Sequence, residues 1–147
     1  MIDVHRVNVW VHDQQAALEF WTAAVGFELR ADATFPELGG FRWLTVGPPG
    51  GRGPELVLMA IPEPPVVTRA QSDLIREVTA QGLAGAVYLA TDDVRRDHAL
   101  LAARGVEFTE EPEARPYGLD AGFRDPSGNQ IRLTQTPTQT PPDGAPR

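Results

Sequence analysis

The chain begins with a segment in which apolar and polar residues alternate. In residues 4–13, VHRVNVWVHD, Val7, Val9 and Val11 recur at every second position, and this period of two is typical of a strand with one buried face. Residues 12–27 then change to helical spacing, with Asp13 as the expected N-cap and Gly26 as the residue that ends the helix. A strand followed by a helix is therefore the first predicted unit.

Three further strands are expected after this helix, at 27–33, 41–47 and 55–62. The loop PPGGRGP, residues 48–54, joins the last two as a hairpin. The segment 63–83 then connects to the rest of the chain, and its middle favours a short amphipathic helix.

The second half repeats this order. A strand is expected at 85–93, and the helix after it begins at Asp93 or Asp92 and ends at Gly105. Three more strands are expected, at 106–112, 118–126 and 129–136. Asp13 precedes Gly26 by thirteen positions, as Asp92 precedes Gly105, and this equal spacing indicates an internal duplication.

These elements predict an α+β domain over residues 1–135, built from two tandem βαβββ modules. Module one covers about 1–62 and module two about 84–135. The last residues, 136–147, are rich in Pro and Thr with little to bury, so a disordered tail is expected there.

Composition and charge narrow the classes of function. A chain of 147 residues with 41% hydrophobic content fits one globular domain with its own core. The net charge of −7 disfavours nucleic acid and acidic membrane surfaces as partners. No apolar run approaches the roughly 18 residues of a membrane span, and the start MIDVHRV does not resemble a signal peptide. A cytoplasmic protein is therefore expected.

The sequence contains no cysteine and no lysine, and this limits the kinds of catalysis and metal binding that the protein can perform. The chain has no Cys, and all thirteen basic residues are Arg. Thiolate nucleophiles, thiolate metal sites and lysine Schiff bases are thereby excluded. The three histidines, His5, His12 and His98, have no partners at metal-ligand spacing.

The doubled βαβββ unit, with LEFWTAAVGFEL at 18–29 and FRDPSGNQIRL at 123–133, resembles the vicinal oxygen chelate superfamily. That group includes glyoxalase I, extradiol dioxygenases and bleomycin-resistance binding proteins, and the resemblance covers about residues 2–135. It implies that the eight strands curl into a cup-shaped sheet with the helices outside. In many members the cup holds a divalent metal through His and Glu ligands.

The family's metal-ligand positions, counted onto this chain, are not occupied by a ligand set. They fall on Arg6, Ala86 and Arg132, and the fourth falls on Glu55 or, with a different loop length, on Val57. At best one ligand of four is retained. The resemblance therefore implies a protein with no metal and no other cofactor, and a displaced divalent-metal site, such as His5 with Glu55, is the alternative.

The alternation of residues in the first strand gives an independent test of whether Arg6, and not His5, occupies the family's first metal-ligand position. Val7, Val9 and Val11 share one face with His5, and the opposite face carries Arg6, Asn8 and Trp10. The valine face is expected under the helix, because Arg and Asn would be buried there without partners. We therefore expect Arg6 to point into the cup and His5 to point away. The same alternation turns Ala86 and Tyr88 inward in module two.

The candidate ligand-binding residues share an expected position on the inner face or lip of the cup. They are Arg6, Asn8, Trp10, Glu55, Tyr88, Tyr117 and Arg132. The two arginines form either a cationic subsite for a carboxylate or phosphate, or an Arg–Glu–Arg cluster with Glu55. Both arrangements leave excess positive charge, which favours an anionic or electron-rich guest. Trp10, Trp43, Tyr88, Tyr117 and Phe123 are candidates for stacking on a flat ligand.

Two hypotheses about function follow. The first is metal-independent binding of a small aromatic or anionic molecule, similar to bleomycin-resistance sequestration, with no catalytic residue identified. The second is a glyoxalase-type lyase or isomerase, or a dioxygenase, that uses a divalent metal at a non-standard site. A homodimer is expected in both cases, because a strongly curled sheet with open edges favours pairing with a second copy.

Overall fold

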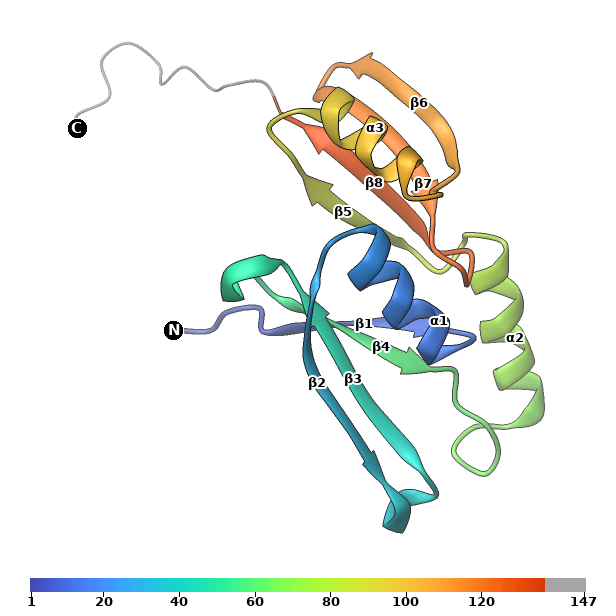
Figure 1. The fold of residues 1–147 in the computed structure, drawn as a ribbon. Helices are drawn as coiled ribbons and strands as arrows, with labels where there is room; N and C mark the ends of the chain where they lie inside the picture. The colour runs from blue at the N-terminus through green and yellow to red at the C-terminus, as the bar shows by residue number, and fades with distance from the viewer. Residues whose placement is uncertain (137–147) are drawn as a thin grey trace.

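The structure is a computed structural model that describes residues 1–136. Its eight strands form two four-stranded mixed sheets with the orders β1-β4-β3-β2 and β5-β8-β7-β6. Figure 1 shows the sheets one above the other, with α1 on one face of the first sheet and α3 on the matching face of the second. The predicted α+β fold of two βαβββ modules is confirmed. Most of the tail expected at 136–147 lies outside the described residues.

Module one holds the first sheet. Its elements are β1 (Arg6–Val11), α1 (Gln14–Glu19), a π-helical turn (Phe20–Ala24), β2 (Glu28–Phe35), β3 (Phe41–Gly47) and β4 (Glu55–Ala60). Short 3₁₀ turns follow β2 (Pro36–Leu38) and β3 (Pro49–Gly51). Asp13 caps α1 by accepting a hydrogen bond from the backbone N–H of Ala16 at 3.0 Å. Gly26 has φ +91°, as the end of the helical segment requires.

Module two repeats this arrangement after the connecting helix α2 (Arg69–Ala80). Its elements are β5 (Ala86–Ala90), α3 (Val94–Ala103), β6 (Phe108–Arg115), β7 (Gly118–Arg124) and β8 (Gln130–Gln135). Of the two aspartates proposed as the cap of α3, Asp93 has this role, because its carboxylate accepts from the N–H of Arg96 at 2.9 Å. Within the described residues, no helix has both the length and the apolar character needed to cross a bilayer.

One hydrophobic core runs through both modules. Val9 and Val11 on β1 are buried in it with Trp21, on the helical side of the first sheet. Phe123 belongs to the same core, with only 1% of its surface exposed, and its ring lies 5.1 Å from that of Phe108. The prediction that Phe123 stacks on a ligand is therefore wrong, because β7 turns this ring toward α3 and away from the cup.

The DPSGN turn between β7 and β8 fastens module two to β1. The Asp125 carboxylate accepts hydrogen bonds from the backbone N–H groups of Ser127, at 3.0 Å, and Asn129, at 2.8 Å. The Asn129 amide in turn donates to the Trp10 carbonyl at 2.8 Å. Burial raises the pKa of Asp125, although the hydrogen bonds from Asn129 and Ser127 oppose this shift. The turn therefore fixes how the two sheets face each other.

Candidate functional site

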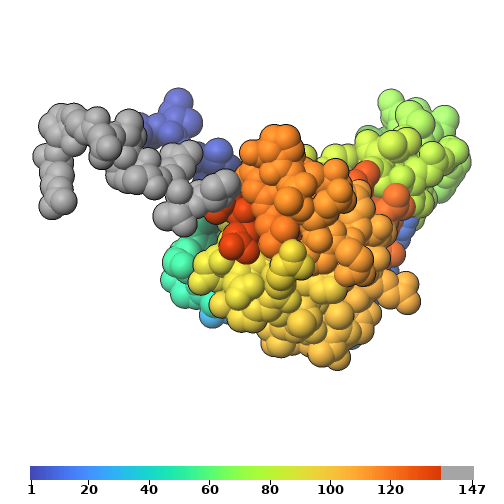
Figure 2. All heavy atoms as spheres, turned by 90° about the horizontal axis from the view of Figure 1, so that it is seen from above, coloured from blue at the N-terminus to red at the C-terminus, as the bar shows by residue number. Residues whose placement is uncertain are grey.

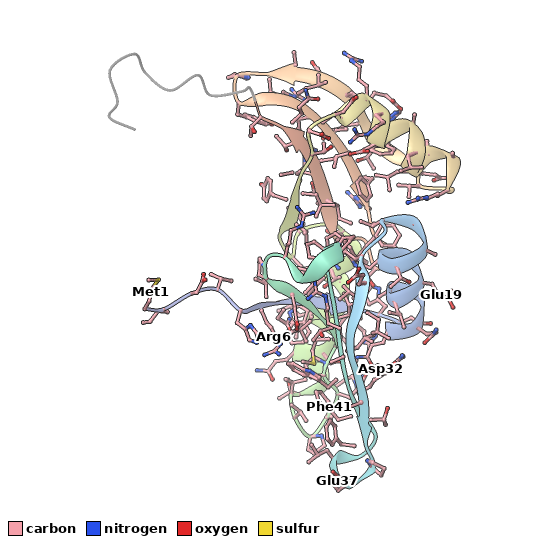
Figure 3. The ribbon with its side chains drawn as sticks, turned by 60° about the vertical axis from the view of Figure 1, so that its left-hand side comes forward. Met1, Arg6, Glu19, Asp32, Glu37 and Phe41 are labelled. Carbon is pink, nitrogen blue, oxygen red and sulfur yellow. The ribbon has the colours of Figure 1, made fainter. Side chains whose placement is uncertain are left out.

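The face of the first sheet away from α1, here called the first half-cup, carries an ion pair. Arg6 on β1 lies beside Glu55 on β4, and its Nε donates to the carboxylate at 2.9 Å. The Arg6 guanidinium also lies 5.7 Å from the centre of the Trp43 ring. In Figure 3, Arg6 and Glu19 of α1 lie on opposite sides of the first sheet. The structure thus places the Arg6 side chain on the face away from the helix.

The other two candidates on this face, Asn8 and Trp10, lie further along β1. Asn8 pairs in register with Val57, and Trp10 pairs with Met59. Asn8 is exposed and Trp10 is half-buried. Of the two residues considered for the fourth position, Glu55 is the one in register with Arg6.

Arg132 is the centre of a polar cluster on the second half-cup, the face of the second sheet away from α3. Its guanidinium donates to Glu110 on β6 at 3.0 Å and to Asp120 on β7. The Asp120 side chain is only 1% exposed and also accepts from the hydroxyls of Tyr117 and Thr134, each at 3.2 Å. Strands β6, β7 and β8 and the turn at Tyr117 therefore contribute to one connected network. Tyr88 on β5 lies in register with Arg132 beside it.

Charge pairing fixes the protonation states in this network. Burial would raise the pKa of Asp120, but the hydrogen bond and charge of Arg132, together with the hydrogen bonds from Thr134 and Tyr117, outweigh it, and the pKa lies below its ordinary value. The Arg132 guanidinium likewise lowers the pKa of Glu110. Burial, followed by the hydrogen bond to Asp120, raises the pKa of Tyr117. At neutral pH the network therefore offers two carboxylates, a guanidinium and a protonated phenol.

The second half-cup is hollowed into a cavity of about 500 Å³. Its floor is polar, formed by Asp120, Arg132 and Thr134, and its sides carry the rings of Tyr88 and Tyr117. The two rings are 76% and 57% exposed, so they are available to a ligand. A volume of this size lies within the range of roughly 300–1,000 Å³ typical of small-molecule sites.

The expected Arg6–Glu55–Arg132 cluster does not form in this chain. Arg6 does pair with Glu55, but Arg132 pairs with Glu110 and Asp120 on its own module. Glu110 also pairs with Arg115, which in turn pairs with Glu113, so three arginines face four carboxylates in these clusters. The expected excess of positive charge is therefore wrong, and the reason for favouring an anionic guest is lost.

Asp120 and Glu110 are the functional candidates that the sequence reasoning missed. A signal for Asp120 was present, because in GLDAGFR it alternates with Leu119 and Ala121 and shares a face with Gly122. Gly122 is the partner of Arg132 across the β7–β8 pair. Glu110 was harder to place, because register shifts interrupt the pairing of β6 with β7 on both sides of it.

Comparison with known proteins identifies the family. The sequence model of the Glyoxalase/Bleomycin resistance protein/Dioxygenase superfamily matches residues 3–133. The chain belongs to this superfamily. It is 32% identical to YurT, an uncharacterized protein of Bacillus subtilis (strain 168), over 87% of this chain and 94% of YurT.

Two solved structures are similar to this chain over most of both lengths. The crystal structure of UcmS2 is similar with a TM-score of 0.83 and 36% identity, covering 91% of this chain and 98% of UcmS2. TnmS3, an antibiotic binding protein from Streptomyces sp. CB03234, is similar with a TM-score of 0.72 and 35% identity, covering 93% of this chain and 98% of TnmS3.

The superfamily's metal positions do not suit a metal in this chain. Arg6 and Arg132 are cations already paired with carboxylates, and Ala86 has no donor atom. His5 lies before β1 and is exposed. Within residues 1–136, no three His, Asp or Glu side chains are grouped closely enough to hold a metal ion.

We therefore expect divalent metals to leave the thermal stability unchanged. Nickel, zinc, manganese and iron(II) would each be added to protein first treated with a chelator, and the melting temperature would be recorded. A site filled at a hundred times its Kd stabilises a protein by about 2.7 kcal/mol, which such a scan resolves easily. A rise of several degrees with one metal, abolished by His5→Ala, would contradict this expectation.

Proposed function

We propose that this protein binds a small aromatic molecule in its cup, without a metal and without covalent chemistry. The observation that carries the proposal is the second half-cup, where two exposed tyrosine rings flank a buried polar network in a cavity of about 500 Å³. Tyr88 and Tyr117 supply flat apolar surface for stacking. Arg132 and Thr134, which the buried Asp120 holds in place, supply hydrogen-bonding groups that orient the polar edge of a ligand.

Two further observations support binding rather than catalysis. TnmS3, which is 35% identical to this chain, is described as an antibiotic binding protein. In addition, each charged group of the network is paired with another, so none is left as an unpaired acid or base at the floor of the cavity.

The charge balance of the half-cups points to the ligand class. The paired groups comprise four carboxylates and three guanidiniums, so an anionic ring gains no net attraction. They are Glu55, Glu110, Glu113 and Asp120, with Arg6, Arg115 and Arg132. We therefore propose a neutral or cationic aromatic ligand. Isothermal titration tests this with three compounds that share one ring system: 2-naphthylmethanol, 2-naphthylmethylamine and 2-naphthoate. The first two are expected to bind more tightly than the third, and the reverse order would contradict the proposed charge preference.

Removing either ring is expected to weaken binding. Tyr88→Ala and Tyr117→Ala should each raise the Kd for 2-naphthylmethanol about tenfold, because a stacking surface is lost. Leu74→Ala is the matched control, since Leu74 is 59% exposed on α2 and does not line the cavity. Isothermal titration provides the measurement. Equal affinities in all four proteins would show that the ligand does not stack on the tyrosines.

The proposal includes a homodimer in the cytoplasm. Strands β1 and β5 each pair with only one neighbour, so each leaves a free edge. Val7 on β1 is 46% exposed beside one of these edges. Light scattering coupled to size-exclusion chromatography would measure the mass directly, and a monomer at all concentrations would refute the dimer.

A further inference from the structure

A second cavity lies between the two modules, on the side of the sheets that faces the helices. Its volume is about 530 Å³. Three leucines of the shared core contribute to its wall: Leu56 from β4, Leu101 from α3 and Leu133 from β8. This cleft therefore gives a bound molecule access to apolar surface that the half-cups do not offer.

The glycine- and proline-rich loop at 48–54 forms the outer wall of the cleft. The loop is held in place by β2, because Arg30 donates to the Pro48 carbonyl and Glu28 accepts from the N–H of Gly50 at 3.3 Å. Figure 2 shows the teal surface of this part of module one beside the yellow surface of α3 and β5. The same cleft is lined by Pro48, Pro49 and Pro54, so this wall is apolar and fixed by contacts.

Two arginines from different modules lie at the cleft. Arg52 comes from the loop of module one, and Arg104 comes from the end of α3. Among residues 1–136, no carboxylate lies within ion-pair distance of either guanidinium. Arg104 donates to the Ala24 carbonyl at 2.9 Å, which holds its guanidinium in position.

The carboxylate that lines the cleft is already paired. Asp97 accepts hydrogen bonds from Arg96, at 3.0 Å, and from Thr91, and the Arg96 guanidinium lowers the pKa of Asp97. Arg96 also pairs with Asp92, at 2.6 Å, so this group keeps one negative charge, which offsets one of the two guanidiniums at the cleft and leaves the other. A chain with a net charge of −7 thus has a local positive region at an apolar cleft.

We propose that this cleft is a second small-molecule site, which takes an amphipathic carboxylate such as a medium-chain fatty acid. The apolar chain of the ligand lies against the leucine wall, and its carboxylate lies between Arg52 and Arg104, whose planar guanidiniums suit this group. The cleft adjoins the proposed aromatic site, because Tyr88, Leu89 and Ala90 line both cavities. Arg52, Leu100 and Arg104 line the cleft and not the second half-cup, so substitutions at these three positions test the cleft by itself.

Titration calorimetry with decanoate and 1-decanol, both below their aggregation limits, tests the proposal. Decanoate is expected to bind at least tenfold more tightly than 1-decanol, because only decanoate carries the charge. The double variant Arg52→Gln/Arg104→Gln should weaken decanoate binding about tenfold and leave 1-decanol unchanged. Arg95→Gln, an exposed arginine of α3 that does not line the cleft, is the matched control and should bind decanoate like the unmodified protein.

A third variant distinguishes ligand binding in the cleft from ligand binding in the half-cups. Leu100→Asp places a negative charge in the cleft at a position that is 45% exposed, so the fold is retained and decanoate binding is lost. Binding of 2-naphthylmethanol should stay unchanged in this variant. The proposal is overturned if decanoate does not bind, if 1-decanol binds equally well, or if the glutamine variants match the control. It is also overturned if Leu100→Asp changes the oligomeric mass, because the cleft is then a contact between copies.

Discussion

Replacing Arg132 by leucine is expected to lower the free energy of unfolding by about 3–5 kcal/mol, as when one partner of a buried ion pair is removed. The loss is large because the Asp120 side chain is 1% exposed and would remain as a buried carboxylate without its cation. The loss of the contact with Glu110 contributes little, because that side chain is 47% exposed. Urea denaturation followed by circular dichroism measures the change.

The loss of stability caused by Arg132→Leu should also depend on pH, and it should be smaller at low pH than at neutral pH. In the unmodified protein the pKa of Asp120 is lowered, so its stabilising contribution is present above the ordinary pKa and is lost as the pH falls through the lower, folded value. In Arg132→Leu, burial raises that pKa instead, so the folded variant gains stability as its carboxyl takes up a proton. The difference between the two proteins should therefore narrow from pH 7 toward about pH 4.

A second substitution provides the control. Asp120→Asn in the Arg132→Leu background removes the buried charge, so it should recover part of the lost stability and abolish the pH dependence. If Arg132→Leu alone costs less than about 1 kcal/mol, the network is no stronger than an exposed ion pair. Asp120 would then not be the buried anion described here.

Gly128→Ala is the second substitution with a large expected effect. Gly128 has φ +99°, and a Cβ at this position would lie 2.7 Å from the carbonyl oxygens of Thr79 and Ala80 at the end of α2. Backbone strain and overpacking each cost roughly 1–3 kcal/mol, so we expect a total loss of about 3–5 kcal/mol. The substitution would destabilise the DPSGN turn, which joins module two to β1 and α2.

Gly105→Ala is the matched control for this prediction. Gly105 also has a positive φ, of +90°, but a Cβ there would meet no atom within 4 Å. It should therefore cost only the backbone strain, roughly 1–2 kcal/mol. Thermal unfolding of both variants separates the two contributions. Equal losses would mean that the contact between the DPSGN turn and α2 does not constrain the fold.

The fold was predictable because each signal was local. The period of two in β1, the caps at Asp13 and Asp93, and the glycines at 26 and 105 fix elements through neighbouring residues alone. Because the same order of strands and helices recurs in the second half of the chain, the sequence also predicted the two modules. Phe123 was misplaced although the alternation in GLDAGFR puts it on the same apolar face as Leu119 and Ala121, which packs into the core.

The candidate site was predicted less well, because its charge depends on contacts between strands. Counting along the chain brought Arg6, Glu55 and Arg132 together, but a count does not fix which carboxylate reaches which arginine. The answer depends on the register of β6, β7 and β8, which places Glu110 and Asp120 beside Arg132. Without these two carboxylates beside Arg132, the site would carry excess positive charge and would favour an anionic ligand. The expected ligand charge therefore depended more on the register of the strands than on the types of residue present.

The proposed function is tested most directly by a crystal structure of the protein grown with 2-naphthylmethanol. The account predicts the naphthalene ring in the second half-cup, with its centre about 4.5–7 Å from the ring of Tyr88 or Tyr117 and its hydroxyl toward Asp120 or Arg132. A ring bound away from both tyrosines, or a metal ion held by His5 inside the cup, would contradict it.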